Sequence, residues 1–76
     1  MDTAHDRGFG PYTVHTEEFQ GKPRLLALNA WLAAALPLRV VNVINCWLDG
    51  LVSEKAAVRY VKNTLLAMGG KLVPPN

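Results

Sequence analysis

Hydrophobic positions recur with helical spacing along most of the chain after residue 22. Within the segment 23–35, apolar residues fill nearly every face, and only Arg24 and Asn29 are polar. Pro23 suits the first turn of a helix, because its missing N–H would have no partner there. Pro37 biases the residue before it away from the helical conformation. The pattern predicts a first helix over 23–35 that packs centrally or against another chain.

The next segment, 38–48, combines helical spacing with residues that favour strands. The helical positions are Val40, Val43, Ile44, Trp47 and Leu48. Several of these residues are β-branched, which favours a strand. Because the helical spacing persists through the whole segment, we predict a second helix that ends at Asp49–Gly50. A strand is the alternative, and it would replace a helical fold by an α+β fold.

A third helix is indicated after this turn. Ser53 is a good N-cap, Glu54 complements the helix dipole, and Gly69–Gly70 ends the pattern. The apolar positions are Ala57, Tyr60, Val61, Leu65 and Met68. The basic positions, on the other side, are Lys55, Arg59 and Lys62. The helix is therefore predicted to be apolar on one side and basic on the other.

The N-terminal residues contrast with these segments. Gly8, Gly10 and Pro11 interrupt a polar stretch, and Tyr12–Thr16 alternates weakly between apolar and polar residues. We predict a flexible acidic arm over 1–22 with a short strand in it. A helical domain over 23–73 and a tail over 74–76 follow. The expected fold is mostly α: a small three-helix domain with a helix-turn-helix.

Composition and charge narrow the class of protein. The chain has 76 residues, enough for one domain, and half of them are apolar. Such a composition indicates either a large core or a surface that meets a partner or a second copy. Residues 1–22 carry a net charge of −2 and residues 23–76 carry +4, which suits an anionic partner. The single cysteine and the absence of a long apolar run predict a cytoplasmic protein without a membrane span.

The stretch Val52-Ser53-Glu54-Lys55-Ala56-Ala57-Val58-Arg59-Tyr60-Val61 resembles the turn and recognition helix of bacterial and phage helix-turn-helix DNA-binding regulators. The resemblance extends from Asn42 to Val61 and includes Gly50 in the turn. It departs from the family pattern at Val58, which is apolar where a polar, base-contacting residue is usual.

The resemblance implies a small DNA-binding transcriptional regulator that acts as a dimer. It would place Lys55 and Arg59 in the major groove, with Arg59 suited to bidentate contact with guanine. The residues implied to contact phosphates are Lys62, Asn63 and Lys71. The apolar segment 23–35 would form the dimer face. The alternative is that the basic residues are only a solvated stripe.

A second hypothesis belongs to another class of function. The chain is also consistent with a small protein-binding adaptor or inhibitor that docks onto a larger protein machine, as phage-encoded regulators do. The expected partner-binding residues are Trp31, Leu28 and Leu32. Aromatic residues anchor interfaces well, but Trp31 and Trp47 would serve equally well as core residues.

Catalysis is not indicated, and we expect neither an enzyme nor a cofactor. His5 and His15 are far in sequence from Cys46, and a thiol–imidazole pair needs a third group and a pocket. Zinc sites need three or four ligands at short spacings, which these residues lack. We therefore predict no catalytic and no metal-binding residues, and a packing role for Cys46.

Overall fold

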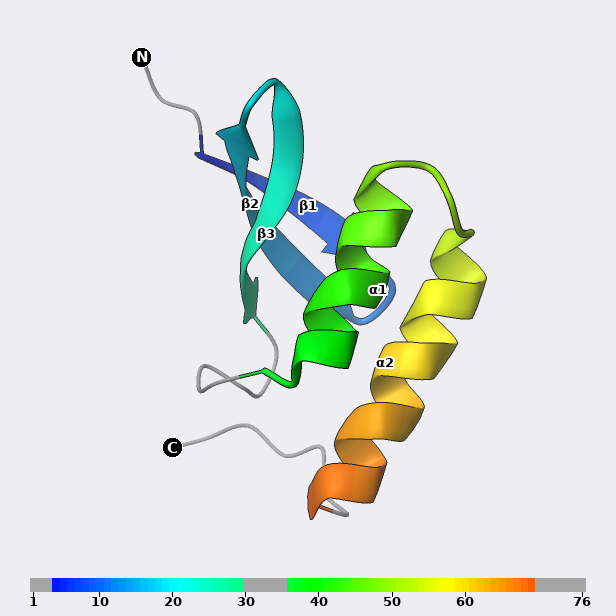
Figure 1. Cartoon of the computed structure of the whole chain (residues 1–76). Helices are drawn as coiled ribbons and strands as arrows, with labels where there is room; N and C mark the ends of the chain where they lie inside the picture. The colour runs from blue at the N-terminus through cyan, green and yellow to red at the C-terminus, as the bar shows by residue number, and fades with distance from the viewer. Residues whose placement is uncertain (1–3, 30–35, 70–76) are drawn as a thin grey trace.

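The computed structural model describes residues 4–29 and 36–69 and shows an α+β fold, with three strands followed by two helices (Figure 1). The strands are β1 (Ala4–Phe9), β2 (Tyr12–Phe19) and β3 (Lys22–Asn29). The helices are α1 (Leu38–Leu48) and α2 (Glu54–Gly69). No helix in these two ranges combines the length and the apolar character that crossing a membrane requires.

The sheet is an antiparallel meander in the order β1-β2-β3, with a tight turn at each end of β2. Phe9 pairs with Tyr12, so only Gly10 and Pro11 form the first turn. Gly10 has a φ of 58°, and type II′ hairpin turns place glycine at this position. In the second turn Gln20 and Gly21 both have positive φ (53° and 80°), as type I′ turns require.

The two faces of the sheet differ in polarity. On β2 the side chains of Tyr12, Val14 and Thr16 are buried, whereas Thr13 and His15 on the other face are partly exposed. This alternation follows from the two-residue period of a strand. One face of the sheet therefore packs into the core, and the opposite face is polar.

The core lies between the sheet and the helices. Its strand residues are Phe9, Tyr12, Val14 and Leu28; its helix residues are Val40, Ile44, Trp47, Ala57, Val61 and Leu65. Phe9 packs against Trp47 with 4.5 Å between ring centroids, and the Arg7 guanidinium lies 4.6 Å from the Trp47 ring centroid. Residues from β1 are thus integral to the core.

Side chains of α1 also bind β3. The main-chain N–H of Leu25 donates a hydrogen bond to Asn45 Oδ1 at 2.9 Å. Arg24 Nη1 lies 2.9 Å from Asp49 Oδ1, in an ion pair just beyond the end of α1. These contacts fix the position of α1 along β3.

The predicted three-helix fold is wrong in its first half. Residues 22–29 form β3 instead of the start of a helix, because hydrogen bonding to β2 outweighs the helical spacing of the leucines. The stretch predicted as a flexible arm supplies β1 and β2, and the expected short strand at Tyr12–Thr16 lies within β2. The rest of the predicted first helix, 30–35, lies outside the described residues.

The two later helices are confirmed, but not as a helix-turn-helix domain. The helix predicted at 38–48 is α1, and the one predicted after Ser53 is α2. Figure 1 shows α1 and α2 side by side and running in opposite directions. This is the arrangement of an αα-hairpin, whereas the helices of a helix-turn-helix cross at roughly 90–120°.

Candidate anion-binding groove

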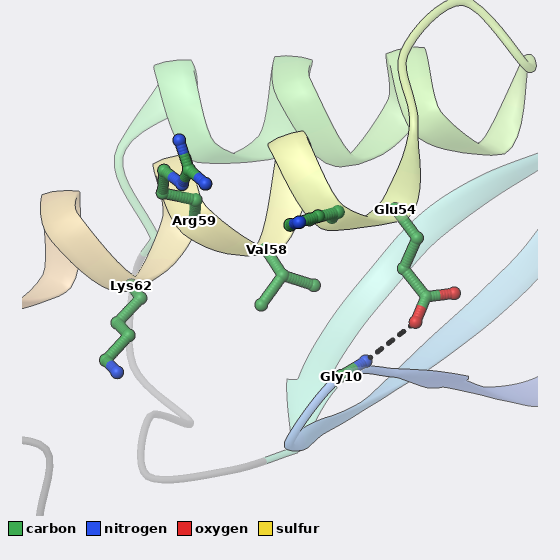
Figure 2. Close-up of a pocket in the computed structure, with 6 residues that line it drawn as sticks. Gly10, Glu54, Val58, Arg59 and Lys62 are labelled. Carbon is green, nitrogen blue, oxygen red and sulfur yellow. Dashed lines mark hydrogen bonds between the residues drawn. The ribbon is translucent and has the colours of Figure 1, made fainter.

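An open groove of about 560 Å³ lies along α2 beside the β1–β2 turn. It is lined by Gly10 of the turn and by Glu54, Lys55, Val58, Arg59 and Lys62 of α2. Figure 2 shows the turn facing the first turns of α2 across this space. The groove is therefore formed by α2, which carries three of the basic residues, and by a turn near the N-terminus.

The start of α2 is fixed by a capping residue. Ser53 Oγ accepts a hydrogen bond from the N–H of Ala56 at 3.2 Å, and the Ser53 carbonyl accepts one from Ala57 at 3.0 Å. Ser53 is thus an N-cap, which satisfies an N–H group that the helix itself leaves without a partner. The cap places Glu54 at the first helical position, beside the groove.

The turn approaches α2 closely because Gly10 has no side chain. A Cβ atom at residue 10 would lie 2.9 Å from both Cγ1 and Cγ2 of Val58. Figure 2 shows the Val58 side chain directed from α2 toward the turn. Val58, which is apolar where the family resemblance would place a polar residue, is therefore a packing residue against Gly10.

A hydrogen bond crosses the groove. The Gly10 N–H donates to Glu54 Oε2 at 3.3 Å, and both residues are exposed (Figure 2). A bond of this length is at the weak end of the range for N–H···O contacts. The Glu54 carboxylate is therefore an anion held opposite the turn by the Gly10 N–H.

The three basic residues predicted from the sequence all line this groove. Lys55, Arg59 and Lys62 are all exposed on α2. Within residues 4–29 and 36–69, no carboxylate lies within ion-pair distance of any of them. Figure 2 shows Arg59 and Lys62 extending from α2 in opposite directions, with Lys62 on the Gly10 side. The cations therefore border the groove instead of forming one straight row.

The remaining predicted site residues lie elsewhere. Asn63 is exposed on α2 but does not line the groove. Leu28 is only 3% exposed and belongs to the core, so its side chain presents no surface to a partner. Trp31, Leu32 and Lys71 lie outside the described residues.

Three lining residues, Gly10, Glu54 and Val58, were not predicted as site residues. Gly10 and Glu54 are 44 positions apart, so no local spacing connects them. The Gly10–Pro11 pair is a turn signal, but a turn reaches α2 only once β1 and β2 pair with each other. Sequence patterns alone therefore predicted three of the six residues that line the groove.

The polar face of the sheet carries a different pair. His15 Nδ1 and Asp6 Oδ1 are hydrogen-bonded across β1 and β2, and Glu17 lies on the same face. Among the residues that the structure describes, no three His, Cys, Asp or Glu side chains come together as metal ligands. Cys46 is partly buried on α1. Asp6 and Glu17 place two carboxylates on this face, and Asp6 is paired with His15.

Comparisons of the chain with protein-family models, with curated proteins and with solved structures gave no match. The function must therefore be argued from the groove itself.

Proposed function

We propose that this protein binds the phosphate backbone of duplex DNA through the groove between α2 and the β1–β2 turn. The observation that carries the proposal is that Lys55, Arg59 and Lys62 border one groove without a carboxylate partner in the described part of the chain. Cations in this state attract a polyanion and release its counterions on binding.

The spacing of the cations favours an extended anion over a single small one. Lys62 is seven positions after Lys55, and a helix rises about 1.5 Å per residue, so the two Cα atoms are about 10 Å apart along the axis. A DNA strand presents a row of phosphates on this scale.

The lining of the groove favours backbone contacts over base reading. Val58 packs toward the turn, and the Glu54 carboxylate faces it, so neither is placed to bind a base edge. We therefore expect weak dependence on DNA sequence. Base contacts by Lys55 and Arg59, phosphate contacts by Asn63 and Lys71, dimerisation and a cytoplasmic regulatory role stay predictions.

The test is a titration of fluorescently labelled random-sequence duplex DNA, followed by anisotropy at several salt concentrations. Neutralising three phosphates predicts a slope of about −2.7 for log affinity against log salt, so that a fourfold rise in salt weakens binding about 40-fold. Lys55→Ala, Arg59→Ala and Lys62→Ala should each reduce the slope by about 1.

The matched control is Lys22→Ala. Lys22 is exposed at the β2–β3 turn, at the other end of β2 from Gly10, and should leave the slope unchanged. Absence of binding at the lowest salt would overturn the proposal. A loss of affinity in Lys22→Ala equal to that in the α2 variants would also overturn it, because binding would then follow net charge alone.

A protein-binding adaptor or inhibitor stays the alternative prediction. The observation in its favour is that large apolar side chains are exposed, including Leu38 (73%), Leu51 (72%) and Phe19 (62%). These three belong to the start of α1, the α1–α2 turn and the end of β2. Docking surfaces are usually contiguous apolar patches. The groove, whose residues share one site, therefore supports the DNA proposal better.

A further inference from the structure

We infer that the Glu54 carboxylate is a built-in competitor for the DNA phosphate that binds next to Gly10, so that binding exchanges one anion for another at the same main-chain donor. This inference rests on the proposed function and adds how the groove is regulated. Its starting point is the hydrogen bond from the Gly10 N–H to Glu54 Oε2 inside a groove bordered by three cations.

The Gly10 N–H is the donor that the β1–β2 turn offers to a ligand. The turn consists of Gly10 and Pro11 alone, and proline has no N–H group. The positive φ of Gly10 is part of the turn geometry, and its N–H already points at a carboxylate oxygen on α2. That oxygen marks the place where an oxygen of another anion would accept the same hydrogen bond.

The carboxylate is held loosely enough to leave. Its hydrogen bond is 3.3 Å long and exposed to water, and no Lys or Arg in the described ranges forms an ion pair with it. When Glu54 rotates away it remains in the first turn of α2, where a negative charge is favourable. A phosphate in its place would gain the Gly10 donor together with the field of Lys55, Arg59 and Lys62.

Two substitutions separate the hydrogen bond from the charge. Glu54→Asp keeps the negative charge but shortens the side chain by one methylene, so the carboxylate no longer reaches Gly10. Glu54→Gln removes the charge. The matched control is Glu17→Gln, which removes the same charge from an exposed residue on the polar face of the sheet.

The experiment measures duplex DNA affinity by anisotropy at one fixed, low salt concentration. We expect Glu54→Asp to bind about threefold more tightly than the wild type, since releasing an exposed polar contact is a small effect. Glu54→Gln should bind about tenfold more tightly, because a nearby repulsive charge is also lost. Glu17→Gln should change affinity less than about twofold, because its charge is farther from the bound strand.

Amide NMR provides a readout that a general change in charge would not give. The Gly10 amide resonance should move in Glu54→Asp without DNA, and in the wild type when DNA is added. Matching far-UV circular dichroism spectra would establish that the variants are folded.

The outcomes distinguish the two proposals. If the wild type binds DNA and Glu54→Asp binds with the same affinity, the competitor inference is overturned and the proposed function stands. The inference also fails if Glu17→Gln tightens binding as much as Glu54→Gln does. If neither the wild type nor any Glu54 variant binds DNA at low salt, the proposed function fails, and the inference fails with it.

Discussion

Asn45 on α1 accepts a hydrogen bond from the main-chain N–H of Leu25 on β3, with 2.9 Å between Oδ1 and N. In the sheet formed by the described residues β3 is an edge strand, so N–H groups on its outer side have no neighbouring strand there to bind. The Asn45 amide takes the place of that strand for Leu25. The contact connects the sheet to the helical hairpin at a partly buried position.

Replacing Asn45 by alanine should lower the free energy of unfolding by about 1–2 kcal/mol, because the Leu25 N–H would lose its partner in a partly buried place. Urea denaturation followed by circular dichroism measures this loss. Asn42→Ala is the control, since Asn42 is exposed on the same helix. Equal losses in the two variants would mean that the bond to Leu25 does not contribute to stability.

Gly10→Ala should be more destabilising than Gly21→Ala. Both glycines have positive φ, which costs a residue with a Cβ about 1–2 kcal/mol. Only at Gly10 would the added Cβ also press on Val58, whereas at Gly21 it would meet nothing within 4 Å. Overpacking typically costs about 1–3 kcal/mol more.

The crowding part of the Gly10→Ala effect can be isolated. In a Val58→Ala background, Gly10→Ala should cost about as much as Gly21→Ala does, because the two Cγ atoms that it would meet are gone. The measurement is a double-mutant cycle of unfolding free energies. No coupling between residues 10 and 58 in this cycle would contradict the close approach of the turn to α2.

Phe9→Ala should destabilise the protein by about 3–5 kcal/mol, because Phe9 is fully buried and packs on Trp47. A small domain has little stability to lose, so this variant is expected to be largely unfolded. His5→Ala is the control, since His5 is exposed on the same strand. Thermal unfolding of both variants tests whether β1 belongs to the cooperative unit; a native-like Phe9→Ala would show that it does not.

Stability should fall in alkaline solution partly through Tyr12. Burial raises the pKa of Tyr12 above its ordinary value of 10.0, because desolvation disfavours the phenolate. The folded state therefore holds this proton more tightly than the unfolded state does. Its contribution to stability is complete below pH 10.0 and is lost as the pH rises through the folded-state pKa.

The measurement compares urea midpoints below and above pH 10.0. Tyr12→Phe should reduce the alkaline loss of stability, whereas Tyr60→Phe, at a position that is 41% exposed, should retain it. If both variants lose stability with pH as the wild type does, Tyr12 is not responsible for the dependence.

The helical half of the fold could be predicted because its signals are local. Ser53 caps α2, and the apolar positions of α1 follow a helical period. The strand β3 could not be predicted this way, because Leu25 and Leu28 fit a helix as well as a strand with an irregular register. What decides between them is pairing with β2, in which Leu25 lies opposite Thr16 and Leu28 lies opposite Val14. Tertiary pairing of this kind often outweighs local propensity.

The candidate site also has one part that could be predicted from the sequence and one part that could not. Lys55, Arg59 and Lys62 could be placed together because they share one helix. Gly10 and Glu54 could not, since their contact depends on the register of the first hairpin. The pairs Gly10–Pro11 and Gln20–Gly21 were the signals for two hairpins, each with two residues between apparent strand ends. Recognising both would have indicated a meander in place of an arm.

The meander also has a consequence for synthesis on the ribosome. Each strand pairs with its neighbour in sequence, so the hairpins need no later part of the chain in order to form. The layer that buries Phe9, Val14 and Leu28 comes from α1 and α2, which are translated afterwards. A nascent chain would therefore carry an uncovered apolar sheet until the helices emerge, and this interval is when it is most exposed to aggregation and to chaperone capture.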